Sequence, residues 1–271
     1  MTIEEPEKKV YFFSDIHLGL PNHEKSLQRE KLLVKCLTEI EHNAKCIYFV
    51  GDIFDFWWEY KSVVPRGFVR FLGKIAELSD KGIEIHFFTG NHDVWLKDYL
   101  VIELGIKLHF HEFETNINEK SFLIAHGDGL GPGDKSYKIL KKLFTNKFLQ
   151  WCYSRLHPNF AFGIGNRWSQ NRRKKEKIYS FAGEDKELLI QYSKEKLNIK
   201  HFDFFVYGHR HIPLIFKLNN NSNMINIGDW IVNFTFAIFD SQTVELKSYK
   251  NGFIENFETD LEKLYKMNLF D

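Results

Sequence analysis

Five short segments of the sequence are rich in residues that bind divalent metal ions. They read SDIHLG, GDIFD, GNHD, AHGD and GHRH, and each has a glycine nearby. Carboxylate, imidazole and amide groups suit manganese, iron or zinc in a catalytic site, whereas a structural zinc site would favour cysteine. Taken together, the segments predict a two-metal catalytic site. The candidate residues are Asp15, His17, Asp52, Asp55, Asn91, His92, Asp93, His126, Asp128, His209 and His211.

The spacing within the segments favours convergence of these side chains. Residues two apart on an extended strand point to the same side, so Asp15 with His17, and His209 with His211, would each aim two ligands at one point. Glycines at 51, 90, 127 and 208 would permit tight turns. One such motif alone is weak, because Asp-x-His is common by chance and Gly-Asn-His-Asp is most often a turn. Five of them, each after an apolar run, are hard to explain by packing needs.

The ligand-rich segments follow apolar runs that predict buried strands. These runs are VYFFS, CIYFV, IEIHFF, SFLIAH and FDFFVY, starting at residues 10, 46, 83, 121 and 202. Helical spacing of apolar residues fills 24–42 and 66–78 between them. The alternation predicts a layered α/β domain with the ligands at the carboxyl ends of its strands. After Pro213, four more strand-like runs predict a second sheet packed on the first.

A different pattern occupies the middle of the chain, and we predict a helical insertion at about 134–180 within a single domain spanning 1–271. Tyr137, Leu140, Phe144, Phe148 and Trp151 recur at helical spacing and predict one amphipathic helix. Residues 135–177 contain twelve Lys or Arg and one acid, although the whole chain has a net charge of only +1. This asymmetry favours a polyanionic partner at one place, although a solvated helix face is the plainer explanation.

Composition limits where the protein works. Its three cysteines have no CxxC spacing, which argues against a disulfide framework and for a reduced, intracellular setting. No window approaches the roughly 20 apolar residues of a membrane span. We therefore expect a protein that is soluble or lies on a membrane surface.

The order of the five motifs resembles that of the calcineurin-like metallophosphoesterases. The resemblance implies a two-sheet β-sandwich flanked by helices and a pair of divalent metal ions, Mn²⁺ first with iron or zinc as alternatives. Two such cations clamp the attacking and leaving sides of a phosphoryl centre, so that water becomes the nucleophile. By position, one ion would be held by Asp15, His17, Asp52 and His211. The other would be held by Asp52, Asn91, His126 and His209, with Asp52 bridging.

His92 and Asp55 match a further pair of the same family. The resemblance implies that His92 faces the phosphate and stabilises charge or protonates the leaving group. Asp55 would fix the tautomer of His92 and raise its pKa. The plainer alternative is that Asp55 caps a helix and His92 only packs.

A narrower resemblance lies outside the metal motifs. The run HGDGLGPGDKSYKILKKLF, with the basic and aromatic stretch after it, is similar to the UDP-2,3-diacylglucosamine pyrophosphatases of lipid A synthesis. This implies a manganese enzyme that releases UMP and the acylated sugar 1-phosphate. The inserted helices would form a lid over the acyl chains. The substrate-binding residues implied by position are Asp134, Ser169, Arg173 and Lys177.

The same resemblance implies a location and partners. The protein would be cytoplasmic and peripherally associated with the inner membrane, with a UDP-linked acylated sugar as substrate and no nucleic-acid partner. No oligomeric state is predicted.

The chain also departs from this narrower family and leaves alternatives open. Well-known members carry Arg at the position of His92 and Glu at that of Asp55. An arginine fork and an imidazole contact a diphosphate differently, so another nucleotide-diphosphate lipid or sugar remains an alternative substrate. A second alternative function is that of a nuclease, which would bind single-stranded nucleic acid with the basic, aromatic insertion. A non-catalytic scaffold is the third, although every ligand position is filled.

Overall fold

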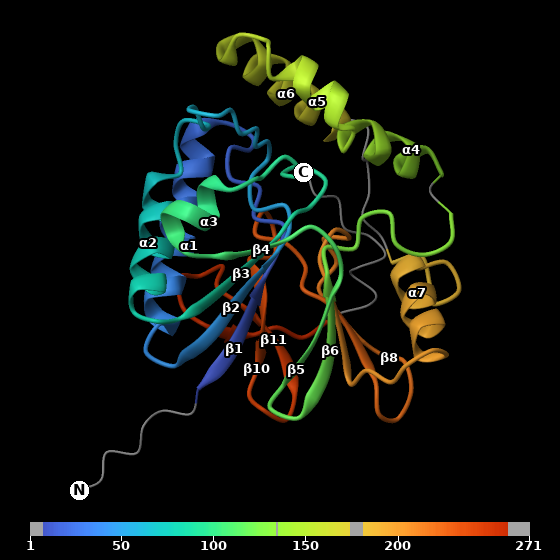
Figure 1. Ribbon diagram of the computed structural model, residues 1–271. Coiled ribbons are helices and arrows are strands. Elements are labelled where there is room, and N and C mark those ends of the chain that lie inside the picture. The colour runs from blue at the N-terminus through green and yellow to red at the C-terminus, as the bar shows by residue number, and fades with distance from the viewer. Residues whose placement is uncertain (1–7, 134, 174–180, 260–271) are drawn as a thin grey trace, which may run out of the picture.

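In a computed structural model, the described residues, 8–133, 135–173 and 181–259, form two mixed β-sheets packed face to face (Figure 1). The first sheet has the strand order β12-β11-β10-β1-β2-β3-β4, and the second has the order β5-β6-β7-β9-β8. Strands β1 to β4 are parallel, as are β6, β7 and β9. The carboxyl ends of parallel strands from both sheets therefore meet at one end of the sandwich.

The bounds of the first sheet follow its strand order from one edge to the other. They are β12 Glu255–Asn256, β11 Val244–Ser248, β10 Thr235–Phe239, β1 Lys9–Phe13, β2 Ala44–Val50, β3 Glu84–Phe88 and β4 Lys107–His109. Those of the second sheet are β5 Phe113–Ile117, β6 Lys120–Ala125, β7 Phe204–Tyr207, β9 Asn223–Asn226 and β8 Leu214–Lys217.

Helices cover the outer faces and one end of this sandwich (Figure 1). Helices α1 (His23–Ile40), α2 (Val69–Asp80) and α3 (Tyr99–Leu104) lie on the first sheet, and α7 (Leu188–Leu197) lies on the second. Helices α4 (Lys135–Phe144), α5 (Lys147–Tyr153) and α6 (Pro158–Arg173) cross the end at which the ligand-rich loops emerge. The predicted two-sheet fold flanked by helices is confirmed.

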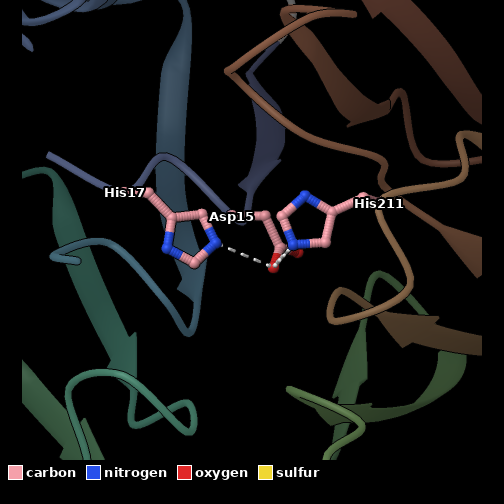
Figure 2. Close-up of side chains that lie close together, drawn as sticks. All are labelled: Asp15, His17 and His211. Atoms are coloured by element: carbon pink, nitrogen blue, oxygen red, sulfur yellow. Dashed lines mark ion pairs between the residues drawn. The ribbon is translucent and has the colours of Figure 1, made fainter. Parts of the chain in front are cut away.

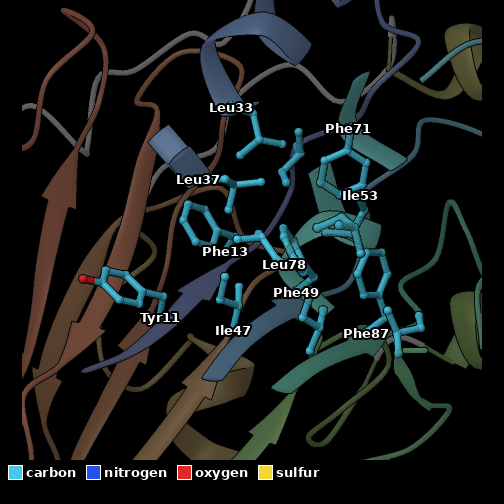
Figure 3. Packing of buried hydrophobic residues seen from close by; sticks show 14 of the residues in the cluster. Tyr11, Phe13, Leu33, Leu37, Ile47, Phe49, Ile53, Phe71, Leu78 and Phe87 are labelled. Atoms are coloured by element: carbon cyan, nitrogen blue, oxygen red, sulfur yellow. The ribbon is translucent and has the colours of Figure 1, made fainter. Parts of the chain in front are cut away.

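Both faces of the central strands are buried, which explains why their sequences show no polar alternation. On β1, Tyr11 and Phe13 face the helices, in the cluster drawn in Figure 3. Val10 and Phe12 on the same strand face the second sheet, where Phe122 and Val206 meet them. A fully buried Phe or Val contributes about 1.5–3 kcal/mol, so these two cores hold the loop ends in fixed relative positions.

Two expectations about the elements were wrong. The runs after Pro213 do not form one sheet, because β8 and β9 extend the second sheet whereas β10 and β11 return to the first. There β10 pairs with β1 and covers what would be an unpaired edge. The predicted single helix over residues 137–151 is also divided, because Asn146 accepts hydrogen bonds from Phe148 N and Leu149 N and starts α5 as a separate helix.

Candidate metal centre

The five ligand-rich segments lie together at one end of the sandwich. Asp15, Asp52 and Asn91 follow β1, β2 and β3 of the first sheet, and His126 follows β6 of the second. The loop after β7 contributes His209 and His211. Segments separated by almost two hundred residues are thus placed in contact by the strands that precede them.

Asp15 lies between two imidazole rings (Figure 2). Its Oδ1 atom is 3.3 Å from His211 Nε2 and 3.7 Å from His17 Nε2. All three side chains are buried, and the two rings are stacked with centroids 5.1 Å apart. Their facing nitrogen and oxygen atoms could share one cation.

Asp52 links this group to a second one. Its Oδ2 atom is 3.7 Å from His17 Nε2 and 3.4 Å from His126 Nε2, so one carboxylate oxygen reaches toward both groups. Asp15, Asp52 and His126 themselves form a potential ligand cluster. The ring of His209 lies edge-on to that of His126, with centroids 5.3 Å apart.

The buried polar atoms of the centre fit a cation. Asp15 Oδ1, Asn91 Oδ1 and His126 Nε2 are buried and make no hydrogen bond within the described part of the chain. Buried polar atoms are normally hydrogen-bonded, so atoms that are not require another partner. These three offer only oxygen and nitrogen, which suits the divalent metals predicted from the sequence.

The pKa shifts of the buried side chains also favour bound cations at this centre. Burial raises the pKa of Asp15 to about 8, and the nearby Asp52 charge adds to this effect. Burial alone would lower the pKa of His126, but the Asp52 carboxylate raises it to about 10. Buried carboxylates this close together repel each other, and cations placed among them would stabilise the ionised form of each.

The backbone angles show that the ligand candidates two residues apart do not point the same way for the reason predicted from the sequence. Asp15, His17, His209 and His211 do not lie on extended strands, because all four have φ angles between 48° and 66°. Asp52, at φ 53°, shares this left-handed conformation, which Asp and His tolerate better than most residues. Sharp local turns, and not strand periodicity, therefore aim these side chains inward. Such conformations cluster at functional sites.

Hydrogen bonds and two close approaches fix the ligand candidates. Asp15 Oδ2 accepts from Ser14 Oγ at 2.9 Å and from His209 N at 2.8 Å. His126 Nδ1 lies 2.9 Å from Val50 O, which leaves Nε2 directed at Asp52. A Cβ at Gly90 would lie 2.2 Å from Asp52 Oδ1, and one at Gly208 would lie 1.9 Å from Ser14 Oγ. The chain therefore has no room for a side chain at either glycine.

His92 and Asp55 are neighbours, but their contact differs from the predicted one. His92 Nδ1 lies 2.9 Å from the main-chain oxygen of Asp55, whereas the Asp55 carboxylate Oδ1 is 3.9 Å away. The main chain of Asp55 thus accepts the Nδ1 proton. His92 N also donates to Asp52 Oδ1 at 2.8 Å, which ties this residue to the centre.

The structure describes only part of the four substrate-binding predictions. Asp134 and Lys177 lie outside the described residues. Arg173 is the last residue of α6, and its side chain is likewise outside the described part. Ser169 is fully buried and bonds to Asp55 Oδ2 at 3.0 Å.

Two acidic residues of the motifs have roles for which sequence reasoning gave no basis. Asp93 accepts hydrogen bonds from the main-chain nitrogens of residues 53, 54 and 90 and so joins two ligand loops. Asp128 Oδ2 accepts from Tyr137 and, at 2.6 Å, from Lys141 Nζ, which ties α4 to the loop after β6. The acidic side chains of Asp93 and Asp128 could be recognised in the sequence, but most of the groups that donate hydrogen bonds to them lie in other segments and could not.

Among the described residues, three cavities lie around the centre. An apolar one of about 290 Å³ lies between the inserted helices and the body. Its lining consists of Phe56, Trp58, Trp95, Leu143, Phe144, Leu149, Gln150, Tyr153, Ile164, Gly165 and Trp168. A larger cavity of about 800 Å³ lies between α1, the 63–68 loop and α6. The third, of about 440 Å³, adjoins His126 and is lined by Phe110, His111 and Lys141 among others.

A sandwich whose strand ends carry this cluster of Asp, His and Asn defines a metal-dependent phosphoester hydrolase. The chain belongs to the calcineurin-like phosphoesterase family, which matches residues 8–213. The resemblance to that family is thereby confirmed.

Individual relatives narrow the likeness. The chain is 42% identical to a UDP-2,3-diacylglucosamine hydrolase of Porphyromonas gingivalis over 90% of this chain and 98% of the relative. It is 27% identical to the enzyme of the same name from Histophilus somni over 82% and 92% of the two chains. Among solved structures, the E. coli phosphoesterase Yfce aligns with a TM-score of 0.45 and 14% identity, covering 91% of this chain and 96% of the other. Within the described ranges, no helix has the length and apolarity needed to cross a bilayer.

Proposed function

We propose that this protein hydrolyses the diphosphate of UDP-2,3-diacylglucosamine to UMP and 2,3-diacylglucosamine 1-phosphate, as a step of lipid A synthesis. The observation that carries the proposal is the apolar cavity beside a buried Asp and His cluster, in a chain 42% identical to a hydrolase of that name. A diphosphate at the cluster would place an attached acyl chain within reach of this cavity.

We assign the ligands in two sets that share Asp52. Asp15, His17, Asp52 and His211 would hold one divalent ion, and Asp52, Asn91, His126 and His209 would hold the other. Manganese is our proposal, with iron or zinc as alternatives. When bound, the two cations would orient the phosphoryl oxygens and lower the pKa of the attacking water.

His92 would act on the leaving group. Its Nδ1 donates a hydrogen bond to the main-chain oxygen of Asp55 at 2.9 Å, so Nε2 is the nitrogen that would exchange a proton with substrate. We propose that a proton held at Nε2 passes to the departing phosphate oxygen. The ring lies 4.9 Å from that of His17, which keeps it beside the metal centre.

The inserted helices, about 134–180, would act as a lid that receives acyl chains. Cavity residues from all three helices face Phe56, Trp58 and Trp95 of the body. Each methylene buried there would contribute about 0.8 kcal/mol. Among the substrate contacts predicted from the sequence, Asp134, Arg173 and Lys177 remain proposals for the sugar or diphosphate.

The outer surface of the same helices supports a membrane-facing role. Phe148, Trp151 and Phe160 are each more than half exposed, and Arg155 lies 4.8 Å from the Trp151 ring. Exposed aromatic residues beside basic ones bind the interface of anionic bilayers. We therefore propose a cytoplasmic protein that attaches peripherally to the inner membrane, where its substrate lies.

The cavity beside His126 is our proposed site for the UMP portion. It adjoins the ligand candidate His126 and shares no lining residue with the apolar cavity, so a diphosphate across the metal ions would direct its nucleoside there. Phe110 is half exposed at its rim and Lys141 supplies a positive charge. An aromatic ring and a lysine suit a base and a phosphate.

The direct test is incubation with UDP-2,3-diacylglucosamine and Mn²⁺, followed by chromatography of the nucleotides. We expect UMP and no UDP. UDP-glucose, which lacks acyl chains, is the matched control and should be cleaved far more slowly. Equal turnover of both, or preferred cleavage of an oligonucleotide with steep salt dependence, would contradict the assignment.

Two glycines of α6 offer a matched test of the lid. A Cβ at Gly165 would lie 2.2 Å from the Phe56 ring, whereas one at Gly163 would meet nothing within 4 Å. Overpacking costs about 1–3 kcal/mol, so Gly165→Ala should raise KM for the acylated substrate about tenfold while Gly163→Ala leaves it unchanged. The same KM in both variants would argue against a substrate-covering lid.

A further inference from the structure

Ser169 lies on α6, the helix that crosses above the metal centre. It is fully buried, and its Oγ is 3.0 Å from Asp55 Oδ2 and 3.2 Å from His92 Nδ1. The next residue toward the N-terminus, Trp168, places its ring 6.4 Å from the His92 ring and packs on Phe144 of α4. The inserted helices thus deliver a hydroxyl group directly to the side chains that flank the centre.

The hydrogen-bond roles of this hydroxyl follow from its partners. An ionised carboxylate only accepts, so the Ser169 hydroxyl proton points to Asp55 Oδ2. The Ser169 oxygen then presents its lone pairs to His92 Nδ1, whose proton also faces the main-chain oxygen of Asp55. Two acceptors converge on Nδ1, which favours the tautomer protonated there and leaves Nε2 for substrate.

Ser169 also fixes the Asp55 carboxylate. Asp55 Oδ1 lies between two imidazoles, 3.8 Å from His17 Nδ1 and 3.9 Å from His92 Nδ1. Both distances exceed that of a hydrogen bond. Ser169 donates to the other carboxylate oxygen, Oδ2, at 3.0 Å and so helps to hold the carboxylate in place.

We propose that Ser169 is a positioning residue for His92, through which the seating of α6 sets the ring orientation and tautomer needed at the metal centre. The inference deepens the proposed function and rests on the part of it that makes His92 a proton donor. It differs from the sugar or diphosphate contact predicted from sequence, because the buried hydroxyl contacts Asp55 and His92.

The primary test is spectroscopic and independent of turnover. Long-range ¹H–¹⁵N correlation of the ring nitrogens distinguishes the two imidazole tautomers. In the unaltered protein we expect a single His92 species with Nδ1 protonated. This tautomer takes up a second proton at Nε2 before it can donate to the leaving group. In Ser169→Ala we expect a mixture of tautomers or exchange broadening at His92, with the signals of His86 unchanged. An unaltered His92 spectrum in that variant would overturn the proposal.

Kinetics on a small diester then separate positioning from substrate contact. Diphenyl phosphate has neither sugar nor acyl chain, and its phenolate leaving group is basic enough to need a proton, so its hydrolysis requires both the metal centre and His92. General acid catalysis contributes about 10²–10⁴-fold, so loss of its positioning should lower kcat by roughly 10–100-fold with KM unchanged. Ser169→Thr, which keeps a hydroxyl, should recover part of kcat. A rise in KM for the acylated substrate alone would instead identify a direct contact.

A double-variant cycle tests whether Ser169 acts through His92. If it does, Ser169→Ala combined with His92→Asn should be no slower than His92→Asn alone. Multiplying losses would show an independent role and overturn the proposal. Because the small diester is used throughout, failure of the UDP-lipid assignment would not alter these outcomes.

Ser193→Ala is the matched control for loss of a buried serine. Ser193 is also fully buried in a helix, α7, and its hydroxyl bonds to Leu189 O at 2.8 Å, far from His92 in the chain. It should lower stability comparably to Ser169→Ala without changing kcat or the His92 spectrum. A similar fall in kcat in both variants would indicate a general structural effect and contradict positioning. Metal content measured by mass spectrometry should be the same in all variants.

Discussion

Buried and half-buried histidines occur in two regions of the described structure, and they face different partners. At the metal centre, imidazole nitrogens face carboxylate oxygens, with His211 Nε2 3.3 Å from Asp15 and His126 Nε2 3.4 Å from Asp52. Along the neighbouring strands β3 and β4, His86 Nδ1 lies 2.8 Å from His109 Nε2, and the other nitrogen of His86 faces the exposed carboxylate of Glu84 at 2.7 Å. The carboxylates of the first region need added positive charge. In the second region, a single proton in the hydrogen bond between His86 and His109 satisfies both nitrogens.

The neighbouring groups decide whether the pKa of a buried imidazole rises or falls. Burial opposes charge on any imidazole, yet the Asp52 carboxylate raises the pKa of His126 to about 10. Burial lowers the pKa of His109 to about 4, and the neighbouring His86 charge lowers it further. The residue type alone therefore does not mark a functional histidine. What marks it is a buried carboxylate within ion-pair distance.

The largest expected effect comes from removing the carboxylate that joins the two halves of the centre. Asp52→Asn keeps the shape and tolerates the left-handed backbone, but it removes the charge. Loss of an outer-shell partner costs about 10–100-fold in activity or metal affinity, so loss of a ligand shared by two ions should exceed this. Turnover of a small diester and metal content should fall together.

The control for that variant lies at the other end of β7. Asp203→Asn also removes a carboxylate, one that bonds to Ser121, and it should leave both quantities unchanged. Normal metal content together with retained turnover in Asp52→Asn would show that the carboxylate does not bridge two ions.

The sequence was sufficient to predict which ligand residues follow the strand ends and meet at this centre. Apolar runs predicted β1, β2, β3, β6 and β7, and parallel strands must bring the residues after them to one edge. The reason offered for Asp15 and His17 was nevertheless wrong, since both are left-handed and lie beyond the strand. A single-sequence pattern locates such a turn but does not give its dihedral angles.

Contacts between distant segments were beyond sequence reasoning. Ser169 and Asp55 are 114 residues apart, and nothing in either local pattern pairs them. The same holds for the division of the strands after Pro213 between two sheets, because register and edge pairing depend on which edge remains open. His86 and His109 lie outside the ligand motifs, and their pairing with each other had no sequence signal.

A smaller effect is expected from removal of divalent ions. Ligand binding at about 1,000 times Kd stabilises a folded protein by about 4 kcal/mol, which for a chain of this size is roughly 10 °C in Tm. Chelator should therefore lower the Tm of the unaltered protein by several degrees in calorimetry. His109→Gln should show the same shift, and Asp52→Asn should show almost none. An equal shift in all three proteins would place the stabilising ion outside the centre.

The smallest effect concerns pH and the paired histidines. The pKa of His109 lies at about 4 in the folded protein against an ordinary 6.5, so the unfolded chain binds a proton more readily. The stabilising contribution of the neutral pair is therefore fully present above pH 6.5 and is lost as the pH falls toward 4. Because the ring is partly exposed, we expect only about 1 kcal/mol. Urea midpoints at pH 7.5 and pH 5, with chelator in all samples to equalise the metal centre, should fall less in His109→Gln than in the unaltered protein. If the two midpoints fall in parallel, His109 is protonated equally in both states, and the contrast between nitrogen-facing and carboxylate-facing histidines does not hold in solution.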